Sequence, residues 1–154
     1  MQRSRIRLTI CCVALLLTVC TVWGNSLLNG NTSGSISSGL SAWIGQIFPF
    51  FSPDSPNGHY LLRKCAHFSI FCLLGIELCW FFGMVRKNGV IMSSMAVSAA
   101  VAAIDETIQR FVPDRYGCFS DVMIDLSGAS FGIALLFLGY AIVQRKKLKQ
   151  ERSL

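Results

Sequence analysis

Four apolar stretches, each long enough to cross a lipid bilayer, constrain the fold of this chain more than any other feature. A helix needs about 20 residues to cross the hydrocarbon core. The four stretches cover residues 6–23, 61–84, 90–111 and 122–143. Only 14% of the residues are charged, whereas soluble chains carry about 25%. The sequence therefore predicts a single all-α domain, an integral membrane bundle of four transmembrane helices.

The basic residues lie where membrane topology predicts them. A net charge of +6 could indicate nucleic acid, but these residues flank the apolar stretches. They precede the first span, separate the second from the third, and follow the fourth: Arg3, Arg5, Arg7, Arg86, Lys87, Arg145, Lys146, Lys147, Lys149 and Arg152. With four spans, all three places fall on one side of the membrane, and the positive-inside rule makes that side the cytoplasm. We therefore expect a multi-pass cell-membrane protein with both termini in the cytoplasm and no nucleic-acid partner.

The first span and the segment after it allow alternatives. The first span could be a signal peptide with RSRIR as its basic region. Its long apolar stretch and the lack of an A-x-A-like cleavage site favour an uncleaved anchor. Residues 24–60 are rich in Gly, Ser, Asn and Pro, which predicts an outer loop. Within this loop, residues 40–51 are aromatic but too short to span, so we expect a short interfacial segment, either a passive anchor or a cap over a pocket.

The seven cysteines are expected to be packing residues. No CxxC pair and no local His/Cys spacing indicates a disulfide framework or a metal site. Cys65, Cys72 and Cys79 recur every seven residues, and together they form one stripe of the second span. Only Cys118 falls in an outer loop.

A dense polar run, DETIQRFVPDRYGCFSDVMID, interrupts the apolar sequence between Asp105 and Asp125. It holds five carboxylates, two arginines and a glutamine. Charge in or beside a bilayer is costly, and it is rarely present without a partner or a function. We therefore expect the functional site to include this run.

The predicted topology brings the polar run close to the start of the second span. The second and fourth spans enter from outside, and the third span leaves toward the outside. Their polar residues therefore meet at the extracytoplasmic face. The candidate ligand-binding or network residues are Arg63, Lys64, His67, Asp105, Glu106, Gln109, Arg115, Ser120, Asp121 and Asp125.

Helical spacing indicates which face of the fourth span is buried. Asp121, Asp125, Gly128 and Gly132 fall at i, i+4, i+7 and i+11, so they form one continuous stripe. A Gly-x-x-x-Gly pattern allows a second helix to approach closely. The span at 90–111 is rich in Ala and Ser and is the expected partner. The two aspartates should then face protein and not lipid.

Local helix rules account for some of these polar residues. Ser120 is the expected N-cap of the fourth span, and Asp121 suits the positive end of its dipole. Glu106 can pair with Arg110 one turn along the same helix. Neither rule explains Asp125, which lies a full turn deeper. Asp125 is therefore expected to belong to a functional site or a polar network.

A metal site is an alternative for part of this cluster. His67, Asp105, Glu106 and Asp125 carry groups that suit Zn or Mn. No local ligand motif supports such a site, so the sequence predicts no metal and no cofactor. The sequence assigns no role to Glu77 or to the basic tail QRKKLKQERSL.

Three motifs carry a resemblance to a known family. They are RKxxHF at 63–68 with LG at 74–75, DExxQxFxPxR at 105–115, and SDxxxDxxGxxxG at 120–132. In order and spacing they resemble the VanZ-like family over about residues 60–132. The family pattern usually has glycine before the arginine that Arg115 matches, and this chain has Asp114 there.

The resemblance implies a small multi-pass bacterial membrane protein. Its best-known member raises resistance to the lipoglycopeptide antibiotic teicoplanin. It implies a role in the cell envelope or in antibiotic resistance, but it implies no reaction. Membrane lipid, a lipid-linked cell-wall precursor or a lipoglycopeptide are the expected partners, and the chain could form a homo-oligomer.

Three functions fit the cluster, and a non-enzymatic binding module is favoured. In that hypothesis Arg63, Lys64 and Arg115 contact an anionic headgroup, and the carboxylates orient it. The alternative is a membrane enzyme with Asp/Glu/His acid–base chemistry on a lipid-linked phosphate or sugar. A purely structural ion-pair network is the third. Transport is disfavoured because no inverted repeat is visible.

Overall fold

The computed structural model describes residues 2–86 and 88–151. Lys87 and Arg152, two members of the basic pattern, lie outside these described residues, as do the side chains of Arg3, Lys147 and Lys149. In chain order the elements are α1 (Gln2–Leu27), α2 (Gly30–Gly45), the short 3-10 helix η1 (Pro49–Phe51), α3 (Gly58–Val85), α4 (Val90–Phe111) and α5 (Phe119–Glu151). The predicted all-α architecture is confirmed.

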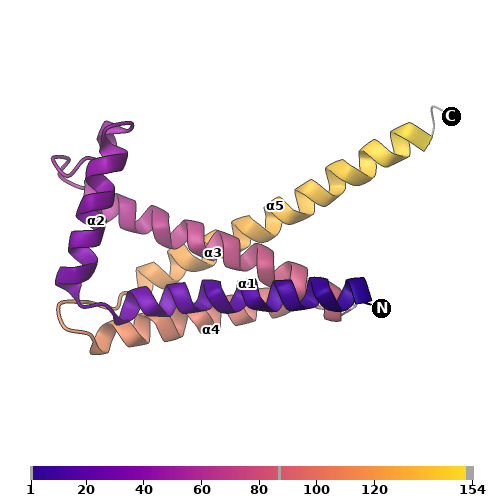
Figure 1. Cartoon of the computed structure of the whole chain (residues 1–154), viewed down its shortest axis with the longest axis horizontal. Helices are drawn as coiled ribbons and strands as arrows, with labels where there is room; N and C mark the ends of the chain where they lie inside the picture. Colours follow the sequence, from indigo (N-terminus) through magenta and orange to yellow (C-terminus); the bar gives the residue numbers. More distant parts are fainter. Residues whose placement is uncertain (1, 87, 152–154) are drawn as a thin grey trace.

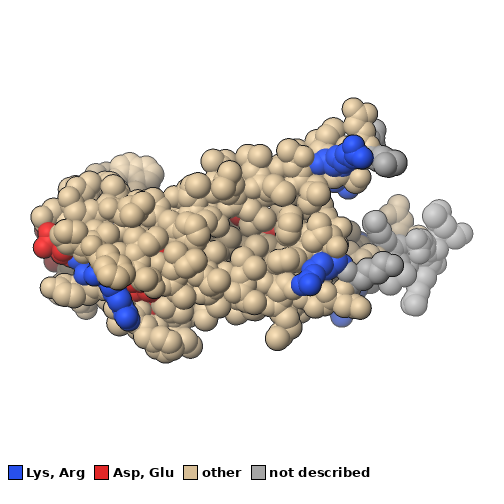
Figure 2. Space-filling model, turned by 90° about the horizontal axis from the view of Figure 1, so that it is seen from below, with Lys and Arg blue, Asp and Glu red and all other residues tan. Residues whose placement is uncertain are grey.

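Four of these helices are long and apolar enough to cross a membrane: Ser4–Leu27, Gly58–Val85, Val90–Phe111 and Phe119–Lys146. Three of them are longer than the sequence predicts, because the apolar stretches leave out the polar residues at the helix ends. Figure 2 shows Lys and Arg near the two ends of the visible face and, between them, a broad band that is almost entirely uncharged, with only small patches of Asp or Glu. Such a band suits the hydrocarbon core.

The helices form a bundle whose ends differ (Figure 1). α1 and α4 lie along one another, while α3 and α5 cross. The start of α1 and the C-terminal end of α5 lie at one end of the molecule. α2 lies at the opposite end, across the ends of the spanning helices. The loop before α5 lies at this second end too, so α2 and the polar run are neighbours.

α3 is the central helix of the bundle. It packs against α1, α4 and α5, most extensively against α5. Phe71 and Leu74 of α3 are completely buried. The apolar core around them consists of Val22, Phe71, Leu74, Leu78, Val101 and Ala102. Below the polar end, the bundle is therefore held by apolar side chains from α1, α3 and α4.

The glycine stripe of α5 packs against α3, not against α4 as its sequence pattern suggested. A Cβ at Gly128 would collide with the carbonyl of Phe68, and one at Gly132 with the carbonyl of Cys72. α3 contributes a glycine of its own, since a Cβ at Gly75 would collide with the backbone of Ala129. α3 is the partner of α5 because both helices have small residues at their contact, which lets the two backbones approach closely.

The predicted outer loop at 24–60 contains a helix, α2, so that prediction was wrong for this part. The side chain of Asn29 caps the helix by accepting a hydrogen bond from the backbone N–H of Thr32 at 2.8 Å. The hydroxyls of Ser35 and Ser38 donate to backbone carbonyls one turn back. Ser41 is fully buried and donates to the carbonyl of Phe51. Glycine and serine form a helix here because the Asn29 cap and the packing against α3 and η1 outweigh their low helix propensity, while the serine hydroxyls are satisfied by carbonyls of the helix itself.

The segment expected at the membrane interface is the end of α2 together with η1. Its large side chains are exposed: Trp43, Ile47, Phe48 and Phe50. Aromatic rings of this kind settle at the boundary between lipid and water. The interfacial position of residues 40–51 stays a prediction.

Candidate functional site

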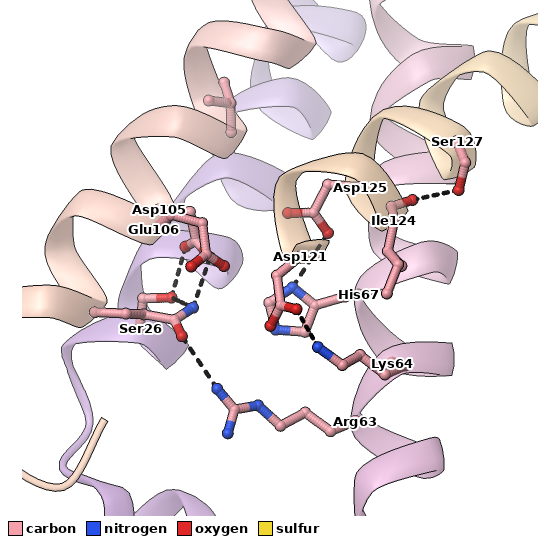
Figure 3. A network of polar contacts seen from close by, with 12 residues as sticks. Ser26, Arg63, Lys64, His67, Asp105, Glu106, Asp121, Ile124, Asp125 and Ser127 are labelled. Carbon is pink, nitrogen blue, oxygen red and sulfur yellow. Dashed lines mark hydrogen bonds and ion pairs between the residues drawn. The ribbon is translucent and has the colours of Figure 1, made fainter. Parts of the chain in front are cut away.

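The polar ends of three helices meet beside α2. The first turns of α3, the last turns of α4 and the first turns of α5 bring the predicted cluster together (Figure 3). Seven of its members are at most 7% exposed although they are polar or charged: His67, Asp105, Glu106, Gln109, Arg115, Asp121 and Asp125. Asp105 and Asp125 each lie six residues from a helix end, a depth of about 9 Å. Burial at that depth requires internal partners.

An ion pair and a histidine–carboxylate contact join α3 to α5. Lys64 forms an ion pair with Asp121, and the two side chains are 14% and 7% exposed. One turn deeper, Nδ1 of His67 lies 3.2 Å from Oδ1 of Asp125. His67 is 7% exposed and Asp125 is completely buried. A spacing of three residues on α3 and of four on α5 therefore produces two stacked contacts between the same helices.

A second network joins α4 to α1. Asp105 accepts hydrogen bonds from the hydroxyl of Ser26 at 2.6 Å and from Nε2 of Gln109 at 2.9 Å. Nε2 of Gln109 also donates to the Ser26 hydroxyl at 3.1 Å. Sequence reasoning missed Ser26, because the predicted first span ended at Trp23. The only signal in the sequence was a pair of polar residues, Asn25 and Ser26, which follow that span closely enough to continue its helix.

Gln109 also connects the two networks. Its Oε1 accepts a hydrogen bond from Nη2 of Arg63 at 3.1 Å. Arg63 thus reaches from α3 to α4 across the middle of the site, as Figure 3 shows. Asp105 on α4 faces the pair of His67 and Asp125, which lies on the side of α3 and α5.

Two local predictions for α4 and α5 were wrong. Glu106 does not pair with Arg110, because its Oε2 accepts the backbone N–H of Cys118 at 2.6 Å. The Glu106 carboxylate therefore binds the backbone of the loop before α5, and the side chain of Arg110 is exposed to solvent. Ser120 is not the N-cap, because α5 begins one residue earlier at Phe119. Ser120 instead donates its hydroxyl to Asp121 at 3.1 Å.

Arg115, in the loop between α4 and α5, is the most unusual member of the cluster. It is 6% exposed, yet none of its three guanidinium nitrogens has a hydrogen-bond partner among the described residues. Burial lowers the pKa of Arg115, and the nearby charge of Arg63 lowers it further. A buried, unpaired guanidinium is costly. It has the geometry to receive an anion from outside the chain.

Three cavities meet at Arg63. Two of them also reach Arg115: one of about 250 Å³ toward α5 and one of about 450 Å³ toward α2. The third, of about 270 Å³, lies between α1, α2 and α3 and also reaches His67. Its walls are mainly apolar, with Val22, Ile36, Leu40, Leu62 and Ile70. The site therefore joins a cationic region to an apolar groove.

Comparison with known protein families gives a match to VanZ/LLP1 over residues 8–141. The chain belongs to the VanZ/LLP1 family. No curated protein and no solved structure matched. The match is longer than the resemblance over 60–132, because it includes most of α1 and all of α2. Ser26 and the docking of α2 are therefore within the VanZ/LLP1 domain.

The structure explains where this chain departs from the VanZ-like pattern. Asp114 replaces the usual glycine, and its φ of 60° lies in the left-handed region. Glycine adopts this region without cost, and Asp is among the few other residues that enter it. Asp114 also accepts a hydrogen bond from Nδ2 of Asn31 at 3.3 Å, and the carbonyl of Pro113 accepts one from the N–H of Gly30 at 3.2 Å. The start of α2 therefore holds the loop that carries Arg115.

Proposed function

We propose that the chain binds the anionic headgroup of a membrane lipid or of a lipid-linked cell-wall precursor. The observation that carries this proposal is the buried guanidinium of Arg115, which has no hydrogen-bond partner among the described residues. A planar guanidinium matches the oxygens of phosphate or carboxylate with two parallel hydrogen bonds. A bound phosphate would supply the missing hydrogen-bond acceptors.

Arg63 is the second cation in this proposal. It lines both cavities that contain Arg115, and only one of its nitrogens has a recorded bond, to the neutral Gln109. Lys64 was expected to contact the anion as well. Its charge is already matched by Asp121, so Arg63 and Arg115 are assigned the headgroup.

The apolar groove favours a lipid over a free phosphate. It begins at Arg63 and continues between apolar residues of α1, α2 and α3. A hydrocarbon chain attached to the headgroup gains about 0.8 kcal/mol per buried CH₂ in such a place. A lipoglycopeptide such as teicoplanin also combines anionic groups with an acyl chain. Resistance would follow if the chain kept the drug from its lipid-linked target or altered envelope composition.

The Arg115→Gln variant tests this function. We expect it to bind anionic lipid about 10- to 100-fold more weakly, because a hydrogen bond to a charged group contributes about 1.5–3 kcal/mol. Binding is measured by adding an anionic phospholipid, an undecaprenyl-phosphate-type lipid or teicoplanin to purified protein in nanodiscs of zwitterionic lipid. Native mass spectrometry identifies the lipid that remains bound.

Arg110→Gln is the matched control, since Arg110 is exposed at the same end of the bundle. It should bind like the wild type. Equal binding by the Arg115→Gln variant and the wild type would refute the proposal. Recovery of a chemically altered lipid would support the enzyme hypothesis instead. Binding of teicoplanin alone would identify the drug as the ligand.

Both termini are proposed to be cytoplasmic, with the headgroup site on the extracytoplasmic side. The exposed thiol of Cys118 reports this orientation, because it lies in the loop at the polar end. A hydrogen bond from Ser120 lowers the pKa of Cys118. The reactive thiolate therefore forms at a lower pH than in a free cysteine.

A membrane-impermeant maleimide should label the wild type in intact cells but not the Cys118→Ser variant. The labelling rate should rise with pH through the lowered pKa, since only the thiolate reacts. In the Ser120→Ala variant this rise should move to higher pH. Labelling that requires opened cells would place the loop in the cytoplasm.

A further inference from the structure

Three potential metal ligands from three helices come together below the headgroup site. His67 of α3, Asp105 of α4 and Asp125 of α5 each offer one ligand atom, and these atoms lie within 4.8 Å of one another. All three residues are buried. The members are far apart in sequence, so no local motif could indicate them.

Two atoms of this group have no hydrogen-bond partner among the described residues. They are Nε2 of His67 and Oδ2 of Asp125. A buried polar atom without a partner costs about 1–3 kcal/mol. An ion held where Nδ1 of His67 faces Asp125 can also bond the unpartnered Oδ2 of Asp125, whereas Nε2 lies on the opposite edge of the imidazole ring.

The geometry of the pair also fits a shared ion. Nδ1 of His67 lies 3.2 Å from Oδ1 of Asp125. Two ligand atoms on one tetrahedral ion of the zinc type are separated by about 3.3 Å, given metal–ligand distances near 2.0–2.1 Å. Asp105 faces this pair from α4 (Figure 3), where it can provide the third ligand.

Among the described residues, neither Asp105 nor Asp125 forms an ion pair with a lysine or an arginine. Lys64 is paired with Asp121, Arg63 donates to Gln109, and the guanidinium of Arg115 bonds neither carboxylate. Two buried carboxylates repel one another strongly where the dielectric constant is low. A divalent cation between Asp105 and Asp125 would remove that repulsion.

We infer that His67, Asp105 and Asp125 bind a divalent transition-metal ion of the Zn²⁺ or Mn²⁺ class. One imidazole nitrogen and one oxygen from each carboxylate form the ligand set, which suits these ions. Glu106 belonged to the set considered from sequence, but it lies outside the group of ligand atoms within 4.8 Å of one another, and its Oε2 is bonded to the Cys118 N–H. The inference replaces the expectation that the chain has no metal site, and it does not depend on the proposed lipid.

The hydrogen bonds around Asp105 fit a ligand that is held in place. Ser26 and Gln109 donate to its two different oxygens. Partners of this kind orient a ligating carboxylate, and their removal costs about 10- to 100-fold in metal affinity. Ser26 and Gln109 are therefore positioning residues for the metal site.

The test uses the purified full chain and compares its two histidines: His67 belongs to the proposed site, and His59 serves as the control. After dialysis against Zn²⁺ or Mn²⁺ and removal of free metal, elemental analysis should find about one ion per chain for the wild type. His67→Gln and Asp125→Asn should each lower the affinity by about tenfold or more. The controls His59→Gln and Asp54→Asn change exposed residues, and they should bind like the wild type.

Measurements on the wild type keep the inference testable if a variant fails to fold. Bound Co²⁺ should give visible absorption bands without the strong charge-transfer band of a thiolate ligand. The Tm should rise by about 5 °C at a hundredfold excess of metal over Kd. A thiolate band, equal binding by the His67→Gln and His59→Gln variants, or no retained ion and no rise in Tm would each overturn the inference.

Discussion

The Gln109→Leu variant should lower the free energy of unfolding by about 4 kcal/mol. Gln109 is completely buried, and its amide makes hydrogen bonds to Ser26, Asp105 and Arg63. Leucine keeps the volume but removes every one of these bonds. Each buried polar group that loses a partner costs about 1–3 kcal/mol. Chemical unfolding in detergent micelles, followed by far-UV circular dichroism, measures the difference.

Gln144→Leu is the control for this experiment. Gln144 is exposed on α5, and its amide donates to the hydroxyl of Tyr140. Its replacement should change the unfolding free energy by less than about 0.5 kcal/mol. If the Gln109→Leu and Gln144→Leu variants unfold alike, Gln109 does not connect the networks in the folded protein.

The Lys64→Met variant should lower the free energy of unfolding by about 3 kcal/mol. Asp121 then remains buried with a charge and without its partner, which is the costly way to break such a pair. The hydroxyl of Ser120 compensates only part of the loss. The same unfolding assay in detergent measures the effect.

A double variant distinguishes the loss of the Lys64–Asp121 ion pair from the cost of leaving one buried charge without its partner. Lys64→Met combined with Asp121→Leu removes both charges, and most of the lost stability should return because apolar residues replace a buried ion pair at little cost. Lys146→Met removes an exposed charge at the far end of α5, and it should have little effect. A double variant less stable than Lys64→Met would contradict the proposed pairing.

The convergence of the polar groups could be predicted because it depends on local and general rules. Apolar length defines four spans, alternation through the membrane defines which ends meet, and a spacing of four places residues on one helix face. Those rules are sufficient to bring Lys64 and His67 close to Asp121 and Asp125. The structure brings these residues together, and it adds the pairing of Lys64 with Asp121 and of His67 with Asp125, which the rules did not specify.

Other features depend on tertiary contacts, so the sequence could not reveal them. Ser26 is an uncharged residue at the end of an apolar span, and its role appears only when Asp105 lies opposite it. The partner of Gly128 and Gly132 was assigned to the helix with the most small residues. The true partner, α3, has Gly75 at the point of closest approach, and only the three-dimensional register selects it.

The α2 helix is another feature that the sequence alone does not predict. Its sequence, GNTSGSISSGLSAWIG, has the composition of a loop. Helix formation depends on the Asn29 cap, on serine hydroxyls that bond within the helix, and on packing against α3. The left-handed backbone at Asp114 likewise explains why the VanZ-like pattern usually has glycine there. The sequence alone showed only that this chain departs from the pattern at this position.

The division of the hydrogen bonds has a mechanical consequence. At the polar end, α3 is tied to α5 by an ion pair and a histidine–carboxylate contact, and α4 is tied to α1 through Ser26. The bond from Arg63 to Gln109 crosses between these two helix pairs. A headgroup that drew Arg63 away would loosen the two halves, whereas an ion shared by Asp105 and Asp125 would cross-link them. Lipid and metal would then oppose one another, and because such linkage is reciprocal, each would weaken the binding of the other by the same factor.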